Sequence, residues 1–322
     1  MPKTRARAAS LAGTSSTRSL AAISRWASGR PITFAPSTAH TRSGQLAQEG
    51  DVANWFCYVA SHATEPFAQA VRGIGEDRAM TTYSGAKEFE GATFVKTSFK
   101  GAALRFCDVS GVTMRGVDVD GLDIDSHDLF FGSLFVNGVD VVPLVDAELN
   151  RQFPGRELQK AQTPEGLRDG WVAVQSAWRE TVAGTPPDLV DAHVEDEWSL
   201  AQTLRHLILA TDAWLRGGIW RMQQPFHQIG QIFTGAAEMG FDMSIFRVDA
   251  PAYEEILAVR AERQQLVTDF LATATPELLA EERDNPWGGG DWHPTVGDCI
   301  RVILEEEWAH LRYIRRDLAR MR

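Results

Sequence analysis

The feature that most constrains the fold is an apolar side chain that returns at every fifth position. Nine residues share this spacing: Phe89, Phe94, Phe99, Leu104, Val109, Met114, Val119, Ile124 and Leu129. An amphipathic helix has a period of 3.6 and a half-buried strand a period of two, so neither keeps these positions on one face. A four-sided β-helix with five residues on each side does keep them together. The spacing therefore predicts about two coils of a quadrilateral β-helix.

This segment resembles the pentapeptide-repeat proteins, through the spacing and through small residues that fall in the same frame. The resemblance implies a right-handed coil. Some acidic members of that group mimic DNA, and the aspartates between Asp118 and Asp128 would suit this role. Two coils are much shorter than a DNA-like rod, so a packing cap for a neighbouring domain is favoured. Cys107 falls at an inward position and is expected to be a small core residue.

The last predicted helix begins at the capping-box pattern of Thr295 with Asp298 and runs to about Leu318. It carries two polar residues in the middle of its apolar stripe. They are Glu306 and His310, one turn apart on the same face. Burial of an ionised carboxylate costs several kcal/mol unless a positive group meets it. A divalent metal would meet it, and a Glu and a His four residues apart are suitably placed as two ligands. A structural Glu–His pair at a helix edge is the simpler interpretation of this spacing alone.

An upstream helix over 199–216 contains His206 beside its apolar stripe. Ser199 and Gln202 form a capping-box pattern, which indicates where this helix begins. Gly217 and Gly218 are expected to stop it. A histidine beside an apolar stripe is more often a hydrogen-bonded structural group than a ligand, so the residue pattern by itself leaves both roles open.

From about Thr163 to Leu318 the chain resembles the DinB-like superfamily, which includes the mycothiol-dependent maleylpyruvate isomerases. The resemblance rests on the runs Glu197-Trp-Ser, Thr203-Leu-Arg-His-Leu, Ala210-Thr-Asp-Ala-Trp-Leu, Pro225-Phe-His and Glu306-Glu-Trp-Ala-His-Leu-Arg-Tyr. It implies a four-helix bundle that holds a divalent metal with one histidine of the second helix and two residues of the fourth. Carried over by position, these ligands are His206, Glu306 and His310. Many members have two histidines in the fourth helix, whereas the Glu/His variant resembles the isomerase branch.

The predicted fold class is therefore α+β, a DinB-like four-helix bundle preceded by a short β-helix. Residues before about position 80 are poor in acids and rich in Arg and Ser, with no sustained period, and are typical of a transit peptide, a disordered tail or a spurious extension. The expected divisions are a leader (1–79), the repeat segment (80–135), a linker with a short helix (136–162) and the bundle (163–322).

Composition limits the partners. The chain has 322 residues, a net charge of −11 and three cysteines. The negative charge argues against nucleic acid, and no apolar run is long enough for a membrane span. Few cysteines in an odd number suit a reducing cytoplasm. We expect a small-molecule substrate, with a homodimer left open.

The resemblance implies a metal-dependent transferase or isomerase that uses a low-molecular-weight thiol, such as mycothiol, on a small electrophilic substrate. Zinc is the first choice of metal, with nickel, iron and manganese left open. The alternative is a non-catalytic, metal-stabilised scaffold in which the repeat segment is an interaction surface. His227 and His293, in the two long connections, are weak candidates for a general acid. Trp287 and Trp292 would line a pocket rim or simply pack.

Overall fold

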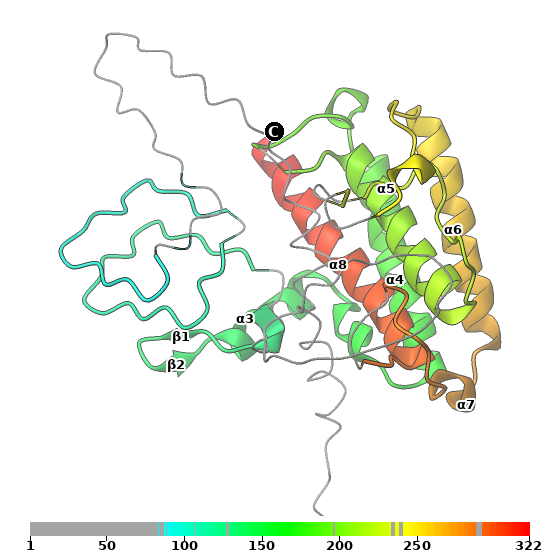
Figure 1. The fold of residues 1–322 in the computed structure, drawn as a ribbon, viewed down its shortest axis with the longest axis horizontal. Coiled ribbons are helices and arrows are strands. Elements are labelled where there is room, and N and C mark those ends of the chain that lie inside the picture. The colour runs from blue at the N-terminus through cyan, green and yellow to red at the C-terminus, as the bar shows by residue number, and fades with distance from the viewer. Residues whose placement is uncertain are drawn as a thin grey trace, which may run out of the picture. The chain divides into compact units, whose positions relative to one another are not determined.

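The computed structural model divides into two compact units, with the boundary in the sequence between Asp120 and Gly121. The described residues are 83, 87, 89–105, 107–126, 129–195, 197–232, 236–237, 241–287 and 292–322. The predicted leader, residues 1–79, lies outside them. We call the described residues before Gly121 the repeat unit and those from Gly121 onward the helical unit (Figure 1).

In the repeat unit the backbone keeps a five-residue spacing. A left-handed φ recurs at steps of five or ten residues, at Gly91, Lys96, Gly101, Gly111 and Gly116. All described side chains of this unit are exposed, including Cys107, so the prediction of Cys107 as a core residue is wrong. The physical reason is that the described part of so short a unit encloses no buried interior. The described residues of the unit form no strand, and the β-helix stays a prediction.

In the helical unit a 3-10 helix, Leu129–Phe131, precedes a short hairpin and a short helix. Strands β1 (Phe135–Val136) and β2 (Val139–Asp140) pair in antiparallel register. Asn137 and Gly138 between them have φ values of 52° and 82°, as a tight two-residue hairpin turn requires. Asn-Gly between two apolar runs predicts such a turn, and the structure confirms it. Helix α3 (Val142–Gln152) follows, with a proline in its first turn, where the missing N–H breaks no helical hydrogen bond.

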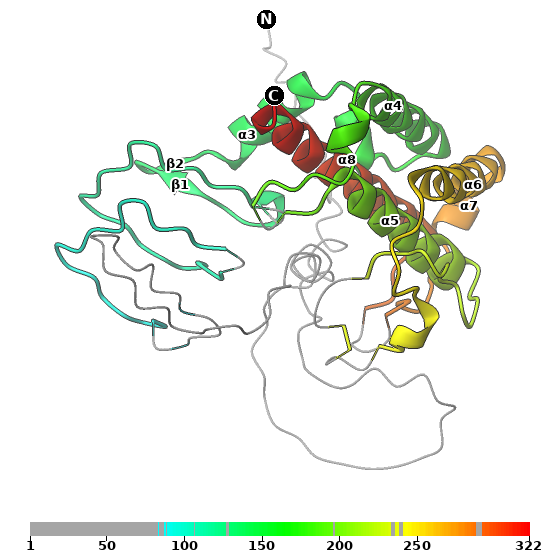
Figure 2. The same ribbon diagram turned by 90° about the horizontal axis from the view of Figure 1, so that it is seen from above.

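Four long helices form the bundle. They are α4 (Pro164–Ala183), α5 (Leu200–Thr211), α6 (Tyr253–Thr273) and α8 (Val296–Arg320). Each of α4 and α5 packs against both α6 and α8, which closes a four-helix arrangement, and both views show the helices side by side (Figures 1 and 2). A short helix, α7 (Pro276–Leu279), lies between α6 and α8 in the sequence. The predicted helical bundle is confirmed.

Three of the helices begin at caps that the sequence pattern predicts, the first of them at Thr163, directly before Pro164. Thr163 Oγ1 accepts a hydrogen bond from a backbone N–H in the first turn of α4. Ser199 with Gln202, and Thr295 with Asp298, form complete capping boxes at α5 and α8. Each such cap stabilises its helix by about 1 kcal/mol, because it satisfies backbone donors that have no partner within the helix.

The core lies between the four helices. Four apolar residues at helical spacing predict a core-facing stripe on α4, and the structure buries all of them: Leu167, Trp171, Val174 and Trp178. Leu204, Ile208 and Leu215 meet it from the second helix, and Ile300 and Leu311 from the last. Burial of each such side chain contributes about 1.5–3 kcal/mol, so this core fixes how the helices face one another.

The expected stop of the second helix at Gly217 and Gly218 is wrong. The chain continues after α5 as a π-helical segment, Asp212–Ile219. A Cβ on Gly218 would lie 3.4 Å from Sγ of Cys299, and one on Gly217 would lie 3.3 Å from the ring of Pro225. The glycines therefore serve close packing against α8 and the following connection, rather than helix termination.

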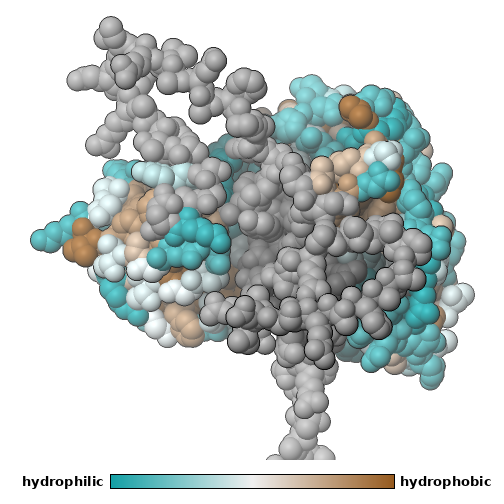
Figure 3. Space-filling model, viewed as in Figure 1, coloured by the Kyte–Doolittle hydropathy of each residue, from teal (hydrophilic) through white to brown (hydrophobic). Residues whose placement is uncertain are grey.

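The visible surface of the helical unit is mostly hydrophilic, with small apolar areas (Figure 3). None of the helices in the described part of the chain is long and apolar enough to cross a membrane.

Candidate metal centre

His206, Glu306 and His310 converge between α5 and α8. Nε2 of His206 lies 3.4 Å from Oε2 of Glu306, and Nε2 of His310 lies 3.2 Å from the same oxygen. One ligand atom from each residue lies within 4.8 Å of the other two. The side chains of His206, Glu306 and His310 are 0%, 6% and 4% exposed. The structure thus brings together the three residues that the sequence resemblance assigned.

Local sequence explains the convergence. Glu306 and His310 are one turn apart, so their side chains project from one face of α8. Their neighbours on that face, Ile303 and Ile314, are buried, so the face that carries the polar pair packs against the core. On α5, Ala210 is one turn after His206 and is itself buried, which leaves space for the imidazole to face α8.

A backbone carbonyl orients His206. Nδ1 of His206 is 3.2 Å from the carbonyl oxygen of Gln231, in the connection after α5. Because a carbonyl only accepts hydrogen bonds, Nδ1 carries a proton, and Nε2 is the ring nitrogen that faces Glu306. An imidazole held by a carbonyl through one nitrogen commonly binds metal through the other.

The spacing of the ligand atoms fits a cation better than a shared proton. For metal–ligand bonds of about 2.0–2.1 Å, the ligand atoms of a tetrahedral site are about 3.3–3.4 Å apart. The two separations from Oε2 of Glu306, 3.2 and 3.4 Å, match this value, and the ligand nitrogens of His206 and His310 lie within 4.8 Å of each other. Charge-assisted hydrogen bonds from an imidazolium to a carboxylate are shorter, about 2.7–2.9 Å. Glu306 Oε2 and His310 Nε2 also have no hydrogen-bond partner among the described residues.

The adjacent carboxylate, Glu307, shows what Glu306 lacks. Glu307 points to the other side of α8, where the buried guanidinium of Arg260 pairs with it. Among the described residues, the ion-pair partners of Glu306 are His206 and His310 alone. The fold thus gives one buried carboxylate a permanent cation and the other only two imidazoles.

The pKa shifts match the protonation states that metal ligands need. Burial raises the pKa of Glu306, but the imidazoles of His206 and His310 outweigh burial and lower the pKa to about 2. Burial lowers the pKa of His310 below its ordinary value, against the opposing pull of Glu306. At neutral pH the carboxylate is therefore ionised and the His310 ring is neutral.

Aromatic side chains cover the cluster. The ring of Trp198 lies 4.8 Å from that of His206 and stacks on that of His310 at 6.1 Å. Tyr313 meets His310 edge to face, with 5.6 Å between ring centroids. Arg312 packs over the Tyr313 ring and pairs with the carboxylate of Asp125 at 2.7 Å. These residues shield the cluster from water, which strengthens any electrostatic interaction within it.

The two histidines considered as general acids lie apart from these ligands. The described residues that form the cluster are only His206, Glu306 and His310. His293 is exposed and lies 3.7 Å from Asp284. Burial and the nearby Arg263 lower the pKa of His227, so this ring is neutral at pH 7. The candidate rim residues are core residues instead, since Trp287 and Trp292 are 3% and 8% exposed.

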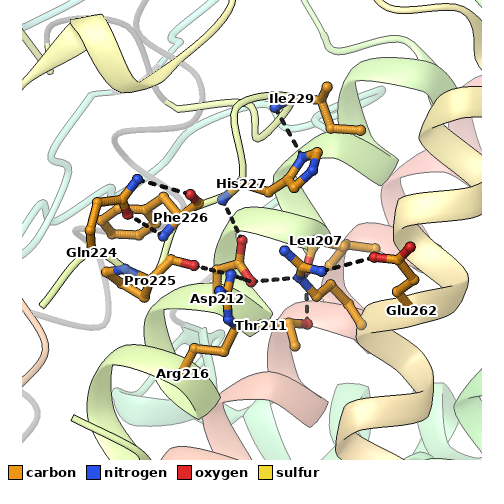
Figure 4. Close-up of polar contacts among 11 residues, drawn as sticks. Leu207, Thr211, Asp212, Arg216, Gln224, Pro225, Phe226, His227, Ile229 and Glu262 are labelled. Carbon is orange, nitrogen blue, oxygen red and sulfur yellow. Dashed lines mark hydrogen bonds and ion pairs between the residues drawn. The ribbon is translucent and has the colours of Figure 1, made fainter. Parts of the chain in front are cut away.

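Sequence reasoning missed a buried carboxylate at the start of the π-helical segment. Asp212 is fully buried and accepts hydrogen bonds from Arg263 at 2.7 Å and from Arg216 at 3.1 Å (Figure 4). Its other oxygen accepts the backbone N–H of His227 at 2.7 Å. The sequence did contain a signal: an aspartate directly follows Thr211, at the end of the apolar stripe of α5. A carboxylate at such a buried position requires a cation from elsewhere in the chain.

Comparison with known families agrees with the helical fold. The family described as the DinB superfamily matches residues 170–314, from within α4 to near the end of α8. The match includes all three converging residues. Comparisons with curated proteins and with solved structures gave no match. The C-terminal region is thus a DinB-like helical domain.

Proposed function

We propose that this DinB-like domain is a metal-dependent transferase or isomerase that uses a low-molecular-weight thiol on a small electrophilic substrate. His206, Glu306 and His310 hold the cation. Two imidazoles and a carboxylate with an open fourth position suit catalytic zinc, and nickel, iron and manganese accept the same donors. Such a cation supplies Lewis-acid chemistry, since it promotes ionisation of a thiol or a water molecule at neutral pH.

The observation that supports the metal is the buried cluster itself. Three ligand atoms converge within 4.8 Å, and the two separations from Oε2 of Glu306, 3.4 and 3.2 Å, suit a shared cation. The described surroundings offer Glu306 no arginine or lysine. An uncompensated buried carboxylate is costly, so a cation is the natural occupant of this point.

Residues around the cluster have separate tasks. The Gln231 carbonyl keeps the proton on Nδ1 of His206. Trp198 covers both imidazoles and excludes water from them. The choice of a thiol, with mycothiol as the first candidate, comes from the resemblance to the isomerase branch. His227 is held at Asp212, six residues or about 9 Å along the helix from His206, so it is at best a remote proton donor.

The test is thiol transfer to a generic electrophile by the wild type, His206→Ala and Glu306→Gln, with metal supplied. The wild type should be faster than both variants, and the two variants should lose the rate together because an incomplete ligand set does not hold the cation. Arg168→Met, at a half-buried arginine on α4 bonded to a backbone carbonyl, is the control and should keep the wild-type rate. A wild-type rate no higher than that of the two ligand variants would contradict the proposed enzymatic activity.

The second candidate is a metal-stabilised scaffold in which the repeat unit is an interaction surface. Its supporting observation is that the described repeat unit exposes large apolar side chains, such as Phe94, Phe99 and Leu104. Chelation should lower the melting temperature in both cases. Only the enzyme should take up an added thiol at the metal and release about one proton as the thiol ionises.

A further inference from the structure

The segment Phe226–Ile232, which we call the strap, runs along α5 and carries the carbonyl that contacts His206. Ile229 within it is fully buried. Gly230 packs closely on α5, since a Cβ there would lie 3.4 Å from Cδ1 of Leu209. The strap is thus packed against the core of the bundle, and its position determines where the Gln231 carbonyl lies.

Arg205 holds the end of the strap nearest the metal cluster. Its Nε donates to the carbonyl of Ile229 at 2.8 Å. Its own backbone carbonyl accepts from the N–H of Gln231 at 3.2 Å. These two bonds hold the backbone on both sides of Gly230, directly before the Gln231 carbonyl. That carbonyl lies 3.2 Å from Nδ1 of the next residue on the helix, His206.

Asp212 holds the other end. It accepts the backbone N–H of His227, and Arg263 of α6 and Arg216 hold its carboxylate in place (Figure 4). Arg216 also donates to the carbonyl of Pro225, just before the strap. The strap is therefore tied to α5 one residue before His206 and six residues after it.

We infer that Arg205 and Asp212 are positioning residues for the metal ligand His206. They hold the strap so that the Gln231 carbonyl keeps the proton on Nδ1 and directs Nε2 toward Glu306 and His310. The inference rests on the proposed metal site. It assigns to the strap, which forms neither helix nor strand, the task of orienting one ligand.

The expected effect is a loss of metal affinity that exceeds any loss of stability. Removal of a group that orients a metal-bound histidine typically weakens binding about 10- to 100-fold. Arg205→Met keeps the aliphatic stem and removes the donor to Ile229. Arg168→Met is the matched control, because Arg168 also donates to a distant backbone carbonyl, that of Leu271, at 2.9 Å.

The experiment uses the full chain and Co²⁺ as the probe. The dissociation constant and the visible absorption of bound Co²⁺ are measured for the wild type, Arg205→Met, Arg205→Lys and Arg168→Met, together with the melting temperatures of the chelator-treated proteins. Arg205→Met should bind Co²⁺ at least 10-fold more weakly, with a changed spectrum. Arg168→Met should bind as the wild type does. Arg205→Lys keeps a donor and should lie between the wild type and Arg205→Met, and it serves in place of Arg205→Met if that variant does not fold.

The experiment distinguishes failure of the metal site from failure of the positioning role. A wild type that binds no Co²⁺ contradicts the metal site, and the positioning role with it. A wild type that binds Co²⁺, with an Arg205 variant of lower melting temperature but unchanged affinity and spectrum, overturns the positioning role alone. Arg205 would then be a structural residue of the strap.

Discussion

The buried pair of Arg260 and Glu307 gives a sharp stability prediction. Their side chains are 2% and 0% exposed, and water does not screen the interaction between them. Removing one member of a buried ion pair leaves an uncompensated charge and costs about 3–5 kcal/mol. Arg260→Met and Glu307→Gln should each lose this much, a large share of the roughly 5–15 kcal/mol by which a typical domain is stable. At about 2–4 °C per kcal/mol for a domain of this size, the melting temperature should fall by about 6–20 °C.

The double variant tests the cause. With both charges removed, the loss should be smaller than the sum of the two single losses, by at least about 2 kcal/mol. Urea denaturation of chelator-treated protein measures the free energy of unfolding for all four proteins. Additive losses would mean that each side chain acts through packing alone and that the two buried charges do not stabilise each other.

The same pair predicts a pH dependence. Burial raises the pKa of Glu307 above its ordinary value, and Arg260 opposes the rise. A carboxyl group whose pKa is raised on folding loses stability as the pH rises from about 4.5 through the folded-state pKa. Without Arg260 the pKa rises further, so Arg260→Met should lose more stability between pH 5 and pH 8 than the wild type. Glu307→Gln has no carboxyl group here and should lose none from this source. Equal losses in the two variants at both pH values would contradict the assignment.

Two further predictions concern packing. Burial raises the pKa of the Cys299 thiol to about 12, so iodoacetamide at pH 8 should leave Cys299 unlabelled in the folded protein and label the exposed Cys107, as mass spectrometry would reveal. Labelling of both at equal rates would contradict the burial of Cys299. Gly155 has a φ of 89°, and a Cβ there would lie 2.5 Å from Cβ of Ala173, so Gly155→Ala should cost about 2–4 kcal/mol. Gly132→Ala, with open space around it, is the control for urea denaturation, and equal stability of the two variants would argue against the strain.

The bundle could be predicted from the sequence because the patterns that indicate each helix lie within that helix. The apolar stripe of α4 and the capping boxes at Ser199 and Thr295 depend only on residues within a few turns of one another. The Asn-Gly turn of the hairpin is equally local. For the same reason the helix ends were predicted within a few residues, except where α5 continues as a π-helical segment through Gly217 and Gly218.

The candidate site was predictable only in part. The spacing of Glu306 and His310 placed both on one face of one helix, but only the family resemblance joined them to His206. The roles of Gln231 and Asp212 depend on where the connection after α5 returns, and a segment without periodicity does not contain that information. The pairing of Glu307 with Arg260 likewise required the packing of α6 on α8, because the two residues are far apart in the sequence.

The most direct test of the metal site is the metal content of the purified full chain. Elemental analysis after metal loading and removal of excess metal should give about one equivalent of zinc or a similar divalent metal per chain. His310→Ala should lose it, because two remaining ligands do not hold a cation firmly. Arg168→Met should keep it. Less than half an equivalent in the wild type, unchanged in His310→Ala, would contradict the metal site and with it the proposed enzyme.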